Sequence, residues 1–350
     1  MALRPVLSLF LLAGLVGFNA GSLCRGGAQS PPSAPPREAS RNAAITGSGN
    51  TASATNAFQV VAPTTIAGAN GRKASAETSI PKPPWGRIVL VGASASAGFT
   101  ESEPFGGPNS RQYRLSRYID AAVAAPHEPV QNFANSMFFL QPEAEGRRQI
   151  GQAARSKPTL VVGLDFLFWF CYGDGSSDEE RLKRFEQGLK LLAGIPCSLI
   201  VGDIPDASAA VDSALSPEQV PSPKAIVAAN RRLKEWAASH RGVVVLPLSK
   251  FMHTVTANQA LTIHGHTFAA GKTRSLLQPD KLHPSALGCA VLTVSLLDAF
   301  AASQPAVSAT DVRWDPQEVL RLGSQPSSRN RPAQAKPAVP AGKGQPGSKK

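Results

Sequence analysis

The sequence predicts a three-layer α/β/α domain with a mainly parallel sheet, because short buried strands alternate with longer amphipathic helices. Four apolar runs have the length of strands and are rich in Val, Ile and Leu without strict polar alternation, which is typical of strands covered on both faces. They are RIVLVG, TLVVGLDFLF, CSLIVGDI and GVVVLPL, at residues 87–92, 159–168, 197–204 and 242–248.

Helical stretches separate or follow these runs. Residues 178–193, 222–240 and 284–302 carry apolar side chains at helical spacing, such as Leu182, Phe185 and Leu189 in the first. Strand followed by helix, repeated, builds a parallel sheet through right-handed crossovers, with helices on both faces.

Residues 1–28 have the order of a secretory signal peptide: Arg4, an apolar run over 6–18, then small and polar residues. The run is shorter than the about 20 apolar residues that a transmembrane helix needs. We therefore expect cleavage after Ala28, or after Ser22, export to the periplasm or the medium, and no stable membrane span afterwards. An uncleaved N-terminal membrane anchor is the alternative.

The flanks of the predicted domain differ from it in composition. Residues 29–84 are rich in Ser, Ala, Pro, Thr and Gly, which is typical of a disordered linker. Residues 323–350 are rich in Gln, Pro, Ala, Gly and Lys and cannot bury enough apolar surface to offset the entropy of ordering. The folded domain is expected over 85–322, followed by a disordered basic tail.

The formal net charge of +12 comes mostly from these flanks. Seven Lys and Arg against two acids precede Trp85, and six against none follow from Gly323, which leaves 23 basic and 22 acidic residues between them. Binding a polyanion needs the positive charge concentrated on the folded surface. The sequence therefore predicts no nucleic-acid partner.

Cysteine and histidine spacings give no metal site. The four cysteines match no metal-ligand pattern, and their apolar neighbours indicate buried small side chains; they are Cys24, Cys171, Cys197 and Cys289. His264 and His266 would share one strand face, but no third ligand accompanies them, so an exposed hairpin is the better interpretation. We predict neither a metal nor another cofactor.

Ser94 is the candidate nucleophile. The stretch RIVLVGASASAGF leads a buried strand straight into a turn of small residues, and Ser94 lies in that turn. Such a turn exposes the hydroxyl, and the backbone N–H groups that follow can face a developing oxyanion. Taken alone, the same serine is better explained as a helix N-cap, because Ser is favoured at that position.

The candidate base lies near the end of the domain, in LLQPDKLHPSALG. Asp280 precedes His283 by three residues, and one turn brings its carboxylate to the Nδ1 side of the imidazole. Pro284 is suited to start a helix. A neutral serine needs such an oriented base, although an Asp before a helix beside a surface His is the alternative.

Together these two segments resemble the SGNH hydrolase family, the GDSL lipases and esterases. The family block GDSxS is matched by GASAS at 92–96, and the block DxxHPxxxG by DKLHPSALG at 280–288. The resemblance covers about residues 85–300 and implies a flavodoxin-like fold with a triad of Ser94, Asp280 and His283.

The chain departs from the family in three places. Ala93 replaces the usual Asp of the first block, and QNFANSMFF at 131–139 lacks the Gly whose N–H lines the oxyanion hole in the family. Asp165 stands where the third block has an oxyanion-hole Asn. A charged carboxylate there would repel the oxyanion, so Asp165 is protonated, or it turns away, or Asn135 supplies the amide. If Asp165 lies in the oxyanion hole, Asp165→Asn should raise kcat.

The resemblance implies an exported serine esterase or acyl hydrolase that deacylates a carbohydrate, such as an acylated polysaccharide, or another small ester. Loss of the Gly and Asn blocks leaves a catalytically degraded, glycan-binding envelope protein as one alternative. An O-acyltransferase that uses the same triad is another.

Overall fold

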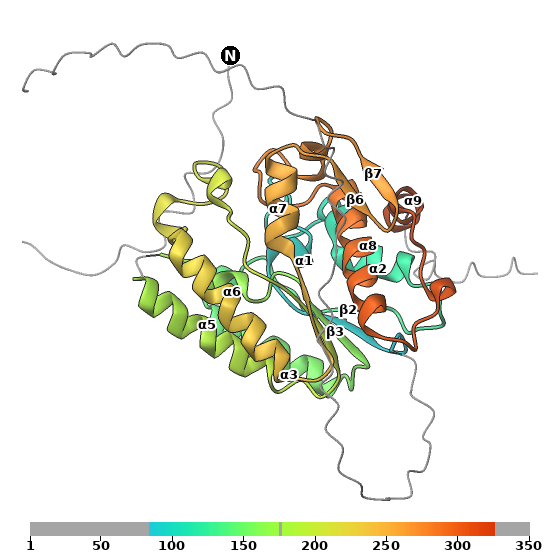
Figure 1. Cartoon of the computed structure of the whole chain (residues 1–350), viewed down its shortest axis with the longest axis horizontal. Helices are drawn as coiled ribbons and strands as arrows, with labels where there is room; N and C mark the ends of the chain where they lie inside the picture. The colour runs from blue at the N-terminus through green and yellow to red at the C-terminus, as the bar shows by residue number, and fades with distance from the viewer. Residues whose placement is uncertain (1–83, 175–176, 326–350) are drawn as a thin grey trace, which may run out of the picture. The chain divides into compact units, whose positions relative to one another are not determined.

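The computed structural model describes residues 84–174 and 177–325 (Figure 1). The predicted signal peptide, the predicted linker up to residue 83 and the tail after 325 lie outside the described residues, so export and processing remain predictions.

A five-stranded parallel sheet forms the centre of the domain, with the strand order β2-β1-β3-β4-β5. The strands are β1 (Ile88–Leu90), β2 (Gln131–Asn132), β3 (Leu160–Gly163), β4 (Ser198–Gly202) and β5 (Val243–Leu246). Each of the four apolar runs contains a strand of this sheet. The order is that of flavodoxin-like folds, so the predicted fold class is confirmed.

Two of these strands depart from the sequence-based expectation. β2 is a two-residue edge strand that pairs only with β1 and has half-buried polar side chains, so no apolar run marks it. The predicted strand 159–168 ends at Gly163, because the chain turns at Asp165 into a short helix.

Helices surround the sheet. They are α1 (Ser94–Ala97), α2 (Leu115–Ala122), α3 (Pro142–Arg155), α4 (Phe168–Cys171), α5 (Asp178–Leu192), α6 (Pro223–Ala238), α7 (Leu248–Thr256), α8 (Ala286–Ser303) and α9 (Pro316–Ser324). The three predicted helices correspond to α5, α6 and α8. α5 begins with a capping box between Ser177 and Glu180, and α8 begins after Ser285, whose hydroxyl accepts the Gly288 N–H.

Two apolar cores lie on opposite faces of the sheet, and successive strand residues alternate between them. Ile88 and Leu90 of β1 pack with α2, α7, α8 and α9. Val89 and Val91 pack with α3, α4, α5 and α6. Figure 1 shows α5 and α6 side by side on one face and α8 with α2 on the other, which gives the three layers.

α8 is the one helix of the described residues that is long and apolar enough to cross a membrane, with a hydropathy of 1.8. Two thirds of it, 67%, is buried inside the domain, where it packs against α2, α9 and β5. This burial in the core accounts for its composition.

The last helix completes the same core. Val319 of α9 is fully buried, and the helix packs against α2 and α8. α9 ends at Ser324, two residues beyond the predicted domain boundary at 322.

A two-stranded antiparallel sheet, β6 (Leu261–Ile263) and β7 (His266–Phe268), forms the expected hairpin. The ring of His264 stacks on Trp314 at 4.0 Å between centroids, and its Nδ1 lies 2.8 Å from Asp298 Oδ1. These contacts fasten the hairpin to the C-terminal part of the domain. Within 84–174 and 177–325, no three His, Cys, Asp or Glu side chains gather as metal ligands.

Parallel strands bring their carboxyl ends to one edge of the sheet, and the candidate residues follow those ends. Ser94 follows β1, Asn135 follows β2, and Asp165 follows β3. The order places β2 and β3 on either side of β1, so the chain changes direction across the sheet at β1. In flavodoxin-like folds ligands bind at this switch point.

Candidate active site

Ser94 begins α1 immediately after the turn that follows β1. Gly92 in that turn has φ +145°, and a Cβ there would lie 2.2 Å from Asp165 Oδ1. A glycine is therefore required for the turn and the carboxylate to approach each other this closely.

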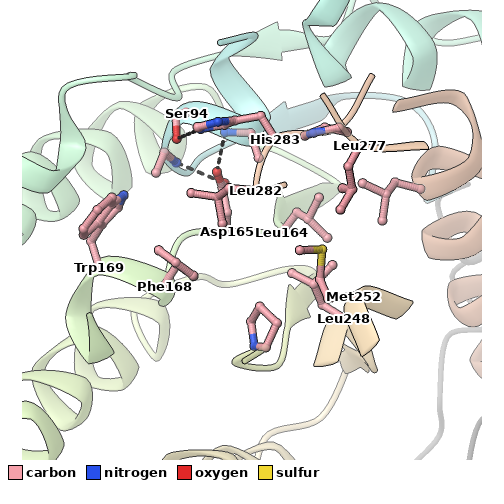
Figure 2. Close-up of a pocket in the computed structure, with 15 residues that line it drawn as sticks. Ser94, Leu164, Asp165, Phe168, Trp169, Leu248, Met252, Leu277, Leu282 and His283 are labelled. Atoms are coloured by element: carbon pink, nitrogen blue, oxygen red, sulfur yellow. Dashed lines mark hydrogen bonds between the residues drawn. The ribbon is translucent and has the colours of Figure 1, made fainter. Parts of the chain in front are cut away.

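His283 connects the candidate nucleophile to the candidate acid. Its Nε2 lies 2.8 Å from Ser94 Oγ, and its Nδ1 lies 2.6 Å from Asp280 Oδ2. Figure 2 shows Ser94 and His283 side by side at the pocket. The two ends of the domain, 189 residues apart in sequence, thus form one chain of hydrogen bonds.

The local backbone explains how an Asp and a His three residues apart can face each other. Asp280 Oδ1 accepts the N–H groups of Leu282 and His283, both at 3.0 Å, while Oδ2 remains for the imidazole. Lys281 between them has φ +60°, which tightens this turn. Asp280 is 2% exposed and His283 5% exposed, so water competes little for these bonds.

Electrostatics favours the ionised form of Asp280. Burial on its own raises the pKa of this carboxyl, but the hydrogen bond and charge of His283 and the two backbone N–H groups outweigh it. The pKa of Asp280 is therefore held below its ordinary value, as suits the partner of an imidazole that gains a proton.

Phe99 is a site residue that the sequence did not indicate. Its ring stacks on the His283 imidazole with centroids 4.1 Å apart and planes 26° apart. Gln278 Nε2 donates to the carbonyls of Phe99 and Pro284, at 2.8 and 3.0 Å, and so joins the two segments. The imidazole is thus held by packing as well as by hydrogen bonds. The only sign of Phe99 in the sequence is its position at the end of the motif GASASAGF.

The Asp165 carboxylate binds the backbone of the nucleophile turn. Oδ1 accepts the Ala93 N–H at 3.0 Å and the Ser96 hydroxyl at 2.6 Å, and Oδ2 accepts the N–H groups of Ala95 and Ser96 at 2.9 and 3.2 Å. Four donors thus point at one carboxylate that is 7% exposed. Of the alternatives that the sequence left open for Asp165, the geometry matches a side chain that turns away from the oxyanion, because its carboxylate faces the backbone of the nucleophile turn.

This arrangement leaves one backbone donor of the turn available. The N–H groups of Ala93, Ala95 and Ser96 are all engaged by Asp165. Among the described residues nothing accepts a hydrogen bond from the Ser94 N–H. It is the donor that a developing oxyanion on an ester bound at Ser94 would find unoccupied.

Asn135 joins the loop after β2 to two neighbouring segments. Its backbone N–H donates to the Gly92 carbonyl at 3.1 Å, its Oδ1 accepts the Met137 N–H at 3.0 Å, and its Nδ2 donates to Glu145 Oε1 at 3.1 Å. The backbone thus holds the loop against the turn after β1, and the side chain holds it against α3.

Glu145 and Gln149, one turn apart on α3, complete this support and were not indicated by the sequence. The fully buried Gln149 accepts the Gly92 N–H at 2.7 Å and donates to the Gly92 carbonyl at 3.0 Å. Hydrogen bonds from Arg148, Gln149 and Asn135 lower the pKa of Glu145 to about 2. α3 thus supports the nucleophile turn through the two hydrogen bonds between Gln149 and the backbone of Gly92.

A pocket opens beside Ser94 and His283 (Figure 2). Its volume is about 50 Å³, and its walls are mainly apolar. They include Leu164, Phe168, Trp169, Leu248, Met252 and Leu292.

The arrangement is that of an activated serine: a hydroxyl, an imidazole in contact with it and a carboxylate that orients the imidazole. It can perform nucleophilic acyl transfer, because the His283 imidazole can carry each proton transfer and Ser94 can hold the acyl group.

Comparison with solved structures finds lipases and esterases at low sequence identity. A lipase/acylhydrolase from Enterococcus faecalis is 21% identical, matches 64% of this chain and all of its own, and has a TM-score of 0.42. An acetyl-xylooligosaccharide esterase from Geobacillus stearothermophilus, studied as a mutant, is 14% identical over 61% of this chain and 94% of its own, with a TM-score of 0.37. An extracellular lipase from Streptomyces rimosus is 14% identical over 63% of this chain and all of its own, with a TM-score of 0.31.

No family model and no curated protein matches the chain. The solved structures to which the chain is similar are described as lipases, acylhydrolases and esterases. At this similarity, the case for any activity depends on the side chains of the chain itself.

Proposed function

We propose that the protein is a serine esterase or acyl hydrolase that acts through a covalent acyl-enzyme. The observation that carries the proposal is the chain of hydrogen bonds from Ser94 Oγ through His283 to Asp280, at 2.8 and 2.6 Å. Neither a helix N-cap nor a surface histidine requires this continuous arrangement.

The reaction follows from the roles of the three side chains. His283 Nε2 takes the proton of Ser94 Oγ as this oxygen attacks the ester carbonyl, and the Ser94 N–H stabilises the oxyanion. The same imidazole returns the proton to the departing alcohol, which leaves an acyl-Ser94 ester. Water, deprotonated by His283, then attacks this ester, and Ser94 recovers its proton as the acid leaves.

The carboxylate at residue 165 bears on the rate. Removal of one oxyanion-hole donor typically lowers kcat by about 10²–10³-fold. Because Asp165 offers no amide donor and its carboxylate binds the nucleophile turn, the site should turn over slowly with simple esters.

We further propose a carbohydrate ester as the natural substrate and an exported location for the protein. These two proposals come from the predicted signal peptide and from the motif resemblance. An O-acyltransferase would use the same triad and would differ only in passing the acyl group to a sugar hydroxyl instead of water.

The test is hydrolysis of 4-nitrophenyl acetate by the full-length protein and by its Ser94→Ala and His283→Ala variants. We expect slow turnover by the wild type and loss of turnover in both variants, with unchanged circular dichroism. Equal turnover by the wild type and Ser94→Ala would contradict the proposal. Transfer of acetyl to an added sugar, in preference to water, would favour the acyltransferase.

A further inference from the structure

We propose that the pocket beside Ser94 receives the acyl part of the ester, that it accepts short apolar acyl groups, and that Met252 sets this limit. The inference rests on the proposed esterase function and adds the orientation and class of substrate.

The polarity of the walls decides which half of an ester can enter. Of the described residues that line the pocket, Ser94, Asp165, Trp169 and His283 are the ones whose side chains carry a nitrogen or oxygen atom. The Asp165 carboxylate already accepts four hydrogen bonds from the nucleophile turn, and His283 is bonded to Asp280 and Ser94.

The Trp169 indole N–H is therefore the one side-chain donor that these walls add for the several hydroxyls of a sugar. Burying a hydroxyl without a hydrogen bond is unfavourable, whereas burying a methylene is favourable. The apolar acyl chain belongs in the pocket, and the alcohol half of the ester belongs outside it.

The size of the pocket limits the length of the chain. The space open to the centres of water-sized groups is small, about 50 Å³. A short acyl group therefore suits the pocket, and a long chain such as octanoyl would reach the wall that Met252 and Leu248 form.

Met252 and Leu248 close the pocket opposite the nucleophile. Both come from α7, and Figure 2 shows them on the other side of the pocket from Ser94 and Trp169. They are 5% and 8% exposed and pack into the core behind the pocket. Shortening Met252 removes three heavy atoms from the wall that a longer acyl chain would meet.

The experiment measures kcat/KM of the full-length protein for 4-nitrophenyl acetate, butyrate, hexanoate and octanoate. Because each buried methylene contributes about fourfold, Met252→Ala should raise the ratio of octanoate to butyrate by about tenfold or more. Leu248→Ala should act in the same direction and replaces Met252→Ala if that variant does not fold.

Val255→Ala is the matched control. Val255 lies on the same helix and is fully buried, but it does not line the pocket. Its replacement creates a comparable defect in the core, and the octanoate to butyrate ratio should stay at the wild-type value.

A second series of substrates, methyl, butyl and octyl acetate, tests which half of the ester enters the pocket. Met252→Ala should leave the preference among these alcohols unchanged. A changed alcohol preference with an unchanged acyl preference would overturn the inference, as would an unchanged acyl preference in both pocket variants. If no ester is hydrolysed and no fluorophosphonate labels the wild type, the proposed function itself fails, and this inference fails with it.

Discussion

The carboxylate at residue 165 stabilises the nucleophile turn from outside the turn. In the GDSL-like first block the chain has Ala93 in place of the usual Asp, and the sequence shows this only as a loss. The structure places the carboxylate of Asp165, which follows β3, against the N–H groups of the same turn. That contact joins residues about 70 positions apart, so local patterns could not predict it. The one local signal is Gly92, whose missing Cβ makes room for Asp165.

Asp165→Asn is therefore expected to lower kcat, opposite to the rise expected for a residue of the oxyanion hole. An amide has one acceptor oxygen and an NH₂ group that faces donors, so it cannot accept the four hydrogen bonds that the carboxylate accepts. A small displacement of Ser94 can cost about 10²-fold in rate. We expect a fall of about ten- to a hundredfold in kcat with 4-nitrophenyl acetate.

Asp203→Asn is the matched control for that change. Asp203 is equally exposed, at 7%, and binds the N–H and hydroxyl of Ser249 at the start of α7, both at 2.6 Å. It does not line the pocket at Ser94. An equal loss of kcat in the two variants would show that general destabilisation, and not the turn, explains the effect.

Asp280→Asn tests the acid of the triad. The variant removes the charge that orients the imidazole and stabilises its protonated form, so kcat should fall by about 10³–10⁴-fold. The ordinary pKa of an Asp side chain is about 3.9. In the wild type the pKa of Asp280 lies below that value. Its stabilising effect on the fold is therefore present above about pH 4 and is lost as the pH falls through the lowered pKa. If Asp280→Asn keeps more than about a tenth of the wild-type kcat, Asp280 is not the acid of the triad.

At the scale of elements, apolar runs predict strands well, and polar supports are missed. β1, β3 and β4 are buried on both faces and β5 has one buried and one half-buried face, so the apolar composition of these strands reveals them. α3 has a polar sequence, and two of its side chains support the site: Gln149 binds the backbone of Gly92, and Glu145 accepts a hydrogen bond from the Asn135 side chain. Hydrogen bonds to a backbone leave no recognisable side-chain pattern in the sequence. The candidate triad could be predicted because its residues form two short motifs.

Glu145→Gln should lower the melting temperature by about 2–4 °C near pH 7, because the charge-assisted bonds with Arg148, Gln149 and Asn135 weaken. The pKa of Glu145 is lowered to about 2, so its stabilisation is present above its ordinary pKa and is lost as the pH falls toward that value. The difference between variant and wild type should shrink near pH 3.

Glu143→Gln is the control on the same helix. Its carboxylate is exposed and pairs with Arg147 at 3.5 Å, and such surface pairs contribute little. A difference between Glu145→Gln and wild type that stays constant from neutral to acid pH would contradict the assigned role of the charge.

At the scale of the whole molecule, the predicted end of the folded domain at residue 322 falls inside α9, which ends at Ser324. The sequence gives little sign that α9 belongs to the folded domain. In the stretch VRWDPQEVLRL, a few large apolar residues such as Trp314, Val319 and Leu320 indicate docking. In the structure Val319 is fully buried, and Gly323 lies against the ring of Tyr118. Packing that depends on so few residues is hard to distinguish from a tail by composition.

Truncation separates the docked segment from the predicted tail. Ending the chain after Gln325, or deleting 29–80, should change the melting temperature little, because few apolar residues are removed. Ending it after Asp315 removes α9 from α2 and α8 and should lower the melting temperature by more than about 5 °C. Equal melting of the two C-terminal truncations would show that α9 adds nothing to the core.

The central claim is that Ser94 is an activated nucleophile, and covalent labelling tests it most directly. Full-length protein is treated with a fluorophosphonate, and the modified residue is located by peptide mass spectrometry. Ser96 provides the control, because it is fully buried and donates its hydroxyl proton to Asp165 at 2.6 Å. We predict labelling of the wild type on Ser94, no labelling of Ser94→Ala and at least partial labelling of Ser96→Ala. An unlabelled wild type, or full labelling of Ser94→Ala, would contradict the account.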